Sequence, residues 1–172
     1  GKNYDYSANP YLSRFVFREK LVKIYAWAIT DPNALKAIVR ATKDTGIVEI
    51  GAGKGYWASL LANCGVNVVA YDNGEDKYIG GYYPVEEAGI EMVAFHQDKA
   101  LFLCWPPYAT SMAYDCVSKY KGNILIYIGE NYGGCNADDK FFHFVSKNFK
   151  LDCRIDMVKW EGLHDNLYIY KR

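Results

Sequence analysis

The stretch that decides the fold is IVEIGAGKGYW, which occupies residues 47–57. Its first four residues are mostly β-branched and apolar, and they predict a short buried strand. Gly51, Gly53 and Gly55 follow, and glycine lets the backbone turn sharply and lets a ligand approach without a Cβ in the way. An apolar stripe at helical spacing comes next, formed by Trp57, Leu60, Leu61 and Cys64. A strand, a glycine turn and a helix in this order indicate a nucleotide-binding site in an open α/β sheet.

The rest of the chain alternates between helix and strand patterns. Asn9-Pro10 and Asp31-Pro32 each combine an N-cap residue with a proline, and they predict two helices ahead of the quoted stretch. Further helices are predicted over residues 111–120 and from residue 138 onward. The predicted strands occupy residues 47–50, 66–71, 83–86, 100–104, 124–128, 151–158 and 167–170.

Strands that alternate with helices favour a mostly parallel sheet that is covered by helices on both faces. The last two predicted strands are joined by a short loop, so they pair antiparallel if they are neighbours. We therefore predict an α/β fold with a mostly parallel seven-stranded sheet and an antiparallel last strand. A single domain over residues 1–172 is expected, with N-terminal helices in residues 1–45 and the sheet core in residues 46–172.

Composition narrows the classes of function. The 172 residues include 20 Lys and Arg and 20 Asp and Glu, so the formal net charge is zero and nucleic acid is not favoured as a partner. No run of 18 apolar residues is present, which excludes a membrane-spanning segment. The five cysteines and three histidines show no zinc-ligand spacing, so no metal site is expected. The odd number of cysteines and the polar start of the chain favour an intracellular, cytoplasmic protein, with the nucleus not excluded.

Three nucleotide-binding motifs compete for the glycine stretch. A phosphate-binding P-loop is excluded, because Lys54 is followed by Gly55 rather than by Ser or Thr. A dinucleotide fingerprint is disfavoured, because Tyr56 stands where a small residue lets the helix pack on the sheet. The remaining pattern is an acidic residue, Glu49, followed by three alternating glycines. This pattern resembles the first motif of class I methyltransferases that use S-adenosylmethionine, and the resemblance in element order covers residues 47–172.

The resemblance implies a Rossmann-like methyltransferase fold with S-adenosylmethionine as the cofactor. The glycine loop is then assigned to the cofactor through Gly51, Ala52, Gly53 and Gly55. In methyltransferases of this type, the residue that matches Glu49 orders the glycine loop and works toward the methionine amino end. We therefore expect the Glu49 carboxylate to point at the loop rather than at solvent, because an unpaired carboxylate in an apolar strand is costly.

A second carboxylate supports the same cofactor. Asp72 ends the second strand, 21 residues after Gly51, and a carboxylate at that place accepts hydrogen bonds from two ribose hydroxyls. Asn73 is assigned to the same site. The alternative is that Asp72-Asn73-Gly74 is only a turn signal, since these residue types occur in turns regardless of ligand.

The strand at residues 100–104 delivers Cys104 and Trp105 to the ligand edge of the sheet, followed by Pro106, Pro107 and Tyr108. The two prolines stiffen this loop, and a rigid loop without chemistry is the simpler interpretation. The string is similar to the Asp/Asn-Pro-Pro-Tyr/Phe motif of amino-group methyltransferases, which implies a substrate site there. Trp105 departs from that motif because an indole N–H only donates, which disfavours adenine N6 and cytosine N4 as acceptors. Tyr108 is left to stack on a planar acceptor.

Loops that follow the later strands supply candidates for acid–base chemistry. Glu130 is a candidate base or substrate anchor, and His164 titrates near neutrality and is a candidate base. Asp165 is assigned to the substrate site beside it. Ordinary structural roles remain the alternative for each of these loop residues. Tyr25 and Trp27 fall at a helix end and are both candidates to close the methionine end of the cofactor site. An ordinary core role is the alternative for both, and it is favoured more for Trp27 than for Tyr25.

Taken together, these patterns predict a methyltransferase that transfers a methyl group from S-adenosylmethionine to an unknown acceptor. The neutral charge favours a small molecule or a protein over nucleic acid as that acceptor. Two alternatives stay open: a non-catalytic binding module that keeps the methyltransferase fold, and an NAD-dependent oxidoreductase, which Tyr56 disfavours.

Overall fold

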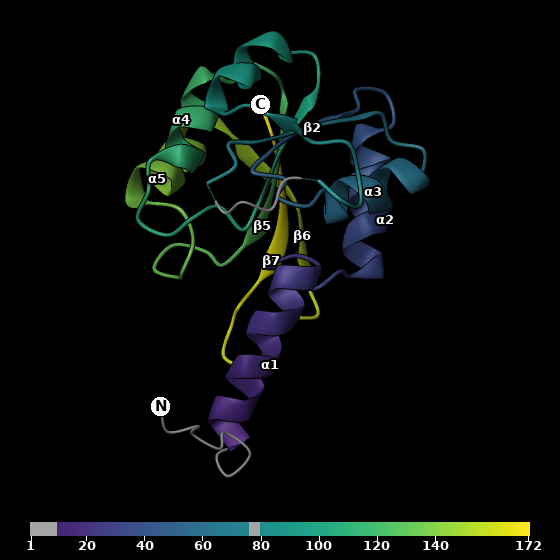
Figure 1. The fold of residues 1–172 in the computed structure, drawn as a ribbon. Coiled ribbons are helices and arrows are strands. Elements are labelled where there is room, and N and C mark those ends of the chain that lie inside the picture. Colours follow the sequence, from purple (N-terminus) through teal and green to yellow (C-terminus); the bar gives the residue numbers. More distant parts are fainter. Residues whose placement is uncertain (1–9, 76–79) are drawn as a thin grey trace.

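A computed structural model describes residues 10–75 and 80–172, and Figure 1 shows its fold. Seven strands form one sheet in the order β3-β2-β1-β4-β5-β7-β6. Their bounds are β1 (Ile47–Ile50), β2 (Val68–Asp72), β3 (Glu86–Glu87), β4 (Ala100–Cys104), β5 (Ile124–Gly129), β6 (Lys150–Asp156) and β7 (Asn166–Lys171). The helices are α1 (Pro10–Ile24), α2 (Pro32–Thr42), α3 (Tyr56–Asn63), α4 (Met112–Lys119) and α5 (Asp139–Asn148), with a 3-10 helix, η2 (Ile90–Phe95).

The pairing of the strands matches the predicted fold class. β1 pairs in parallel with β2 and β4, β2 pairs in parallel with β3, and β4 pairs in parallel with β5. β7 lies antiparallel to both β5 and β6, so it is the one reversed strand of the sheet. The predicted α/β fold, with a mostly parallel seven-stranded sheet and an antiparallel last strand, is confirmed.

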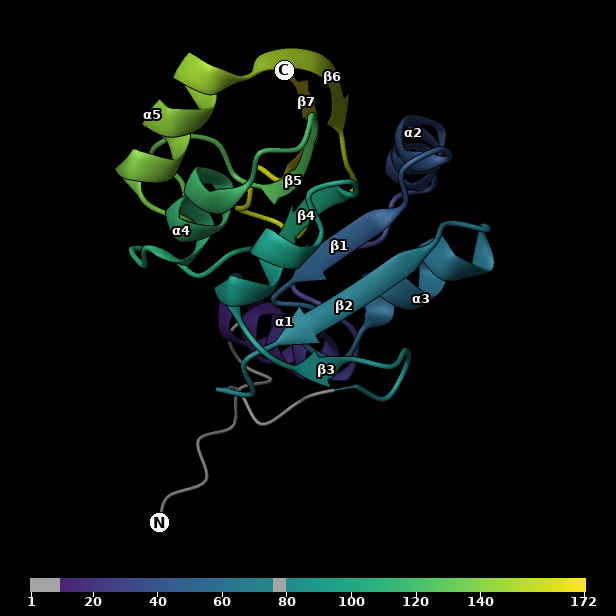
Figure 2. The same ribbon diagram turned by 90° about the horizontal axis from the view of Figure 1, so that it is seen from above.

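Helices cover both faces of the sheet, and each face has its own apolar core (Figure 2). Successive strand residues point to opposite faces, so Ile47 packs into the core with α2 and α3, whereas Val48 packs into the core with α4 and α5. Large side chains such as Phe102 and Tyr127 are fully buried in these two cores. The parallel strands are therefore apolar on both faces, and Glu49 stands out among them.

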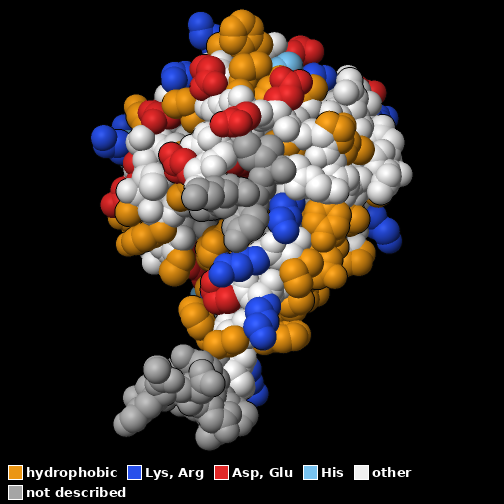
Figure 3. Space-filling view, viewed as in Figure 1, with side chains coloured by type: hydrophobic (Ala, Val, Ile, Leu, Met, Phe, Trp, Pro, Cys, Tyr) orange, Lys and Arg blue, Asp and Glu red, His pale blue; other side chains and the backbone are white. Residues whose placement is uncertain are grey.

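Helix α1 is different, because it extends beyond the body of the sheet (Figure 1). Phe15 and Phe17 are 57% and 60% exposed there. In Figure 3, hydrophobic side chains and Lys and Arg side chains lie side by side over this part of the surface. The predicted cap of this helix, Asn9, lies outside the described residues. The predicted cap of α2 is confirmed, because Asp31 accepts hydrogen bonds from the N–H groups of Asn33 and Ala34.

Three predicted strands have a boundary that is wrong by two residues or more. One is β6, which ends at Asp156 rather than at residue 158. β2 begins at Val68 rather than at residue 66, because the N–H of Val66 donates to the carbonyl of Leu61 and closes the end of α3. β3 has only two residues and begins after the predicted start, because Tyr83 packs across the sheet and donates its hydroxyl to the carbonyl of Val68. The helix η2 was not predicted. In residues 10–75 and 80–172, no helix is both long enough and apolar enough to cross a membrane.

Candidate functional site

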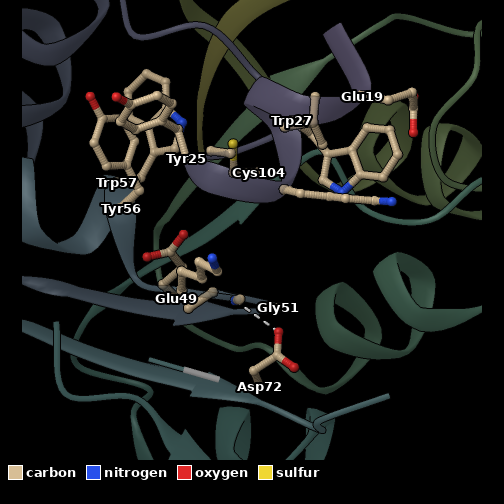
Figure 4. Close-up of a pocket in the computed structure, with 15 residues that line it drawn as sticks. Glu19, Tyr25, Trp27, Glu49, Gly51, Tyr56, Trp57, Asp72 and Cys104 are labelled. Atoms are coloured by element: carbon tan, nitrogen blue, oxygen red, sulfur yellow. Dashed lines mark hydrogen bonds between the residues drawn. The ribbon is translucent and has the colours of Figure 1, made fainter. Parts of the chain in front are cut away.

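A cavity of about 200 Å³ lies at the carboxyl ends of β1, β2 and β4, where the glycine loop faces helix α1 and the link that follows it. Figure 4 shows this cavity with its carboxylates and aromatic rings. Its walls come from segments far apart in the sequence: Glu19, Val22, Lys23, Tyr25, Ala26, Trp27, Glu49, Gly51, Ala52, Gly53, Lys54, Tyr56, Trp57, Asp72 and Cys104. The position agrees with the rule that ligands of open α/β sheets bind beyond the carboxyl ends of the strands.

The glycine loop needs its glycines for two different reasons. Gly53 and Gly55 have φ angles of +53° and +73°, which glycine adopts without strain. A Cβ at Gly55 would lie 2.8 Å from Cβ of Tyr83, so this position is closed by packing. A Cβ at Gly53 would meet nothing within 4 Å, so the backbone there is open to a ligand.

Asp72 ties the glycine loop to the end of β2. Its Oδ2 accepts a hydrogen bond of 2.8 Å from the N–H of Gly53, which is marked in Figure 4. Its Oδ1 accepts a bond of 2.9 Å from the N–H of Gly74, so the turn that the sequence allowed is present as well. Each carboxylate oxygen has two lone pairs, and Asp72 therefore keeps capacity for further donors.

Glu49 is almost completely buried, with an exposed fraction of 2%, and it lines the cavity. Its Oε2 has no hydrogen-bond partner in the part of the chain that the structure describes. Burial, and next the repulsion from Asp72, raise the pKa of Glu49 to about 8. The carboxylate is turned away from solvent as expected, but the hydrogen bond that orders the glycine loop comes from Asp72.

A second unpartnered polar group lines the same cavity. The Trp57 side chain is 2% exposed, and its Nε1–H finds no acceptor in residues 10–75 and 80–172. Buried polar groups normally have a hydrogen-bond partner, and one that lacks it in a folded protein calls for an explanation. Two residues that line one cavity at the glycine loop, Glu49 and Trp57, thus each carry a buried polar atom without a partner among the described residues.

The rings of Tyr25 and Trp27 close the cavity from the side of α1. Tyr25, which the sequence assigned to this place, contacts Tyr56 with ring centroids 5.3 Å apart. Trp27 is 41% exposed and lines the cavity, so the interpretation of Trp27 as a core residue is wrong. Core packing predicts burial, but the link between α1 and α2 runs over the edge of the sheet and leaves the Trp27 ring accessible.

Cys104 and Trp105 occupy the end of β4. Cys104 lines the cavity, and burial raises the pKa of its thiol well above the usual range, so the thiol is neutral. Trp105 does not line the cavity but stacks on Trp27, with ring centroids 5.2 Å apart and planes 10° apart. Its indole N–H donates to Oδ1 of Asp165 at 2.9 Å, in keeping with its nature as a donor.

The other predicted substrate and base residues lie outside the cavity. Tyr108 is 68% exposed. Glu130 is buried, and its carboxylate accepts hydrogen bonds from the N–H groups of Cys135 and His164. The side chain of His164 is 84% exposed, and its Nδ1 lies 3.2 Å from Glu130. Asp165 is fully buried behind Trp105, and burial raises its pKa although the Trp105 bond opposes this.

Three further predicted residues also serve local structure. The carbonyl of Pro106 accepts hydrogen bonds from the segment that precedes α5, and the carbonyl of Pro107 accepts one from Thr110. Asn73 is exposed and caps the N–H of Glu75 with its side chain. None of these residues lines the cavity that the described residues form.

Several residues that line the cavity were missed by sequence reasoning. Tyr56 and Trp57 belong to the decisive stretch itself, so their position as the first two residues of α3, directly after the glycine loop, was a usable signal. Glu19 and Lys23 approach from α1, and no local pattern reveals that α1 lies over the glycine loop.

Comparison with known proteins places the fold. No protein-family model and no curated protein matches the chain. Among solved structures it is similar to a SAM-dependent methyltransferase from Archaeoglobus fulgidus, at 17% identity and a TM-score of 0.55 over 92% of this chain and 99% of that one. It is similar to the N-methyltransferase NodS from Bradyrhizobium japonicum, at 10% identity and a TM-score of 0.54 over 90% and 96% of the two chains.

A third similar structure is 1,6-didemethyltoxoflavin-N1-methyltransferase from Burkholderia thailandensis, which contains 1,6-didemethyltoxoflavin and S-adenosylhomocysteine. The identity is 14% and the TM-score 0.53, over 95% of this chain and 90% of that one. At such identities the likeness concerns the fold alone. This chain has the Rossmann-like fold of S-adenosylmethionine-dependent methyltransferases.

Proposed function

We propose that this protein is an S-adenosylmethionine-dependent methyltransferase. One observation carries the proposal: Glu49 and Trp57 line the same cavity, and Oε2 of Glu49 and Nε1–H of Trp57 are both buried without a hydrogen-bond partner among the described residues. A ligand with a free amino acid group carries a hydrogen-bond partner for each of them. Its ammonium donates to the carboxylate of Glu49, and its carboxylate accepts from the indole N–H of Trp57. The methionine part of S-adenosylmethionine carries both groups.

The remaining cofactor residues fit the same ligand. Asp72 stands at the end of β2 with lone pairs left for ribose hydroxyls, and Gly53 leaves its backbone open to close approach. The volume of about 200 Å³ is below the roughly 300 Å³ at which pockets for whole ligands begin. The cavity is therefore expected to enclose the methionine end, with the adenosine along the open edge of the sheet.

The chemistry that the cofactor supplies is a methyl carbon on a positively charged sulfur, which accepts the bonding electrons as the carbon is transferred to an acceptor atom. The protein has to align the two partners and keep water out, and it needs no strong base when the acceptor loses its proton readily. Glu49 and Trp57 hold one end of the cofactor, and the rings of Tyr25 and Trp27 shield the cavity from solvent.

Isothermal titration calorimetry with S-adenosylhomocysteine, S-adenosylmethionine and NAD⁺ tests the proposal. We expect both sulfur compounds to bind and NAD⁺ to give no heat. Glu49→Gln and Trp57→Phe should each weaken S-adenosylhomocysteine binding about tenfold or more, because each removes one polar partner. Asp44→Asn is the control, since it removes an exposed carboxylate from the loop before β1, at the edge of the sheet opposite to the cavity.

Two results contradict parts of the proposal. Binding of NAD⁺ without binding of either sulfur compound would favour an oxidoreductase and overturn it. Tight binding of S-adenosylmethionine without turnover on any class of acceptor would favour a binding module instead. The specific observation behind that second candidate is the Trp105 indole, whose N–H is already used by Asp165.

A further inference from the structure

Trp27 lines the cavity and has one ring face that Trp105 does not cover. Its ring lies nearly parallel to the Trp105 ring, with planes 10° apart, so Trp105 covers one of its two faces. Trp27 is nevertheless 41% exposed and lines the cavity. The uncovered face is therefore accessible to a ligand.

The nearby cation does not fill this face. The guanidinium carbon of Arg18 lies 5.6 Å from the centroid of the Trp27 ring and 5.6 Å from that of Trp105. A group beyond the free face of Trp27 would be much farther from Trp105 than from Trp27. Because the two distances are equal, Arg18 lies alongside the stacked pair and leaves the outer face of Trp27 open.

The ring behind Trp27 is held unusually firmly. Trp105 has a φ of +54°, which is strained for a bulky residue and persists only where surrounding contacts enforce it. Its backbone N–H donates to the carbonyl of Ile128 at 2.8 Å, and its indole N–H donates to Asp165 at 2.9 Å. A strained, doubly anchored indole gives Trp27 a rigid support.

We infer that the methyl acceptor is a flat aromatic compound that stacks on the open face of Trp27. The inference rests on the proposed function and adds the substrate class. Tyr108, which the sequence favoured for stacking, is 68% exposed and outside the cavity, so Trp27 takes that place. Figure 4 shows Trp27 on one side of Cys104 and the rings of Tyr25, Tyr56 and Trp57 on the other.

The form of the site favours recognition by shape over recognition by hydrogen bonds. Trp105 has no lone pair to offer an amino group, and Cys104 is a neutral thiol and a weak hydrogen-bond partner. Glu49 and Trp57 are assigned to the cofactor, so their polar groups are not left for the acceptor. A flat ring contacts an open indole face over its whole area, whereas a puckered molecule with the same carbon skeleton touches it at fewer atoms.

Two probes with the same carbon skeleton test the inference. 2-Naphthol is flat and decahydro-2-naphthol is puckered, and each carries one hydroxyl group. Binding of each is measured by titration calorimetry against the full chain saturated with S-adenosylhomocysteine. We expect 2-naphthol to bind about tenfold more tightly, and Trp27→Leu to abolish that preference while Trp27→Phe retains most of it. Phe95→Leu is the matched control, because Phe95 is 73% exposed on η2.

The results separate this inference from the proposed function. Equal affinity for the two probes, or a preference that survives in Trp27→Leu, overturns the inference. The inference is also overturned if Trp27→Leu loses affinity for S-adenosylmethionine but keeps its affinity for S-adenosylhomocysteine and for 2-naphthol. The Trp27 ring would then face the sulfonium of the cofactor. Failure of both sulfur compounds to bind, with the preference for 2-naphthol intact in the free protein, overturns the proposed function and keeps the aromatic site. Melting temperatures of the variants exclude loss of folding as the cause.

Discussion

Two buried glutamates stand at the carboxyl edge of the sheet and have opposite surroundings. Glu49 in β1 is 2% exposed, and Glu130, directly after β5, is 4% exposed. Glu130 accepts hydrogen bonds from the N–H groups of Cys135 and His164. Oε2 of Glu49 has no such partner within residues 10–75 and 80–172. The two side chains are almost equally buried, so the difference between them lies in their hydrogen-bond partners and not in their burial.

The protonation of the two side chains follows from these contacts. Burial and the nearby Asp72 raise the pKa of Glu49 to about 8. Burial acts on Glu130 in the same direction, but hydrogen bonds from Cys135 and His164 outweigh it and hold the pKa below its ordinary value. The difference teaches that Glu130 holds two loops together, whereas Glu49 stays available to a ligand.

The largest expected effect is the loss of Glu130. Glu130→Ala should lower the free energy of unfolding by about 3 kcal/mol, because two backbone N–H groups lose their buried acceptor. Urea unfolding followed by circular dichroism measures it. Glu130→Gln keeps one carbonyl oxygen and should cost about half as much. A loss below about 1 kcal/mol in the alanine variant would mean that the loops hold without this carboxylate.

Glu49→Gln should separate binding from stability. The free energy of unfolding at pH 8 should stay the same or rise, because a buried ionised group without a partner is replaced by a neutral one. Affinity for S-adenosylhomocysteine should fall about tenfold or more in calorimetry. If this variant is as unstable as Glu130→Ala, Glu49 is a structural residue and the contrast between the two glutamates disappears.

The two glutamates should respond to pH with opposite signs. Glu49 ionises near 4.5 when the chain is unfolded and near 8 when it is folded, so its presence destabilises the fold increasingly as the pH rises through this window. Glu130 has a lowered pKa, so its contribution is complete above 4.5 and is lost as the pH falls through the folded value. Urea unfolding from about pH 3 to pH 9 should show that Glu49→Gln removes the first trend alone. Parallel curves for that variant and the original protein would refute the assignment.

The smallest expected effect is that of the His164 side chain. His164→Ala should change the free energy of unfolding by less than about 0.5 kcal/mol, because the ring is 84% exposed and Glu130 keeps the backbone N–H of residue 164. Thermal unfolding measures the change. A change as large as that of Glu130→Ala would show that the ring, rather than the backbone, carries the link between the loops.

Much of the fold could be predicted because its signals are local. The strand, glycine turn and helix of residues 47–57 lie in one stretch, and the period-two pattern of β6 is legible in sequence. The start of β2 was wrong because the N–H of Val66 closes α3 instead of joining the sheet. Competition between a helix end and a strand for one N–H depends on geometry that the apolar pattern does not contain.

Only the part of the site that lies at the ends of the strands could be predicted from the sequence. Glu49 and Asp72 follow directly from the ends of two strands, and both line the cavity. The bond from Trp105 to Asp165 joins residues 60 positions apart, and the Trp27–Trp105 stack joins distant segments as well. Periodicity and motif spacing describe neighbours along the chain, so they do not predict these contacts or decide between the two roles considered for Trp27.

The helix α1 and the link that follows it depend on contacts with segments much later in the sequence, and this has a consequence for synthesis. Trp160 donates its indole N–H to the carbonyl of Trp27, 133 positions away, and Arg14 contacts Glu161 across 147 positions. These partners leave the ribosomal exit tunnel only after all the parallel strands have emerged. The side of the cavity that Trp27 forms is therefore expected to be completed late, after the strand ends that form the other side.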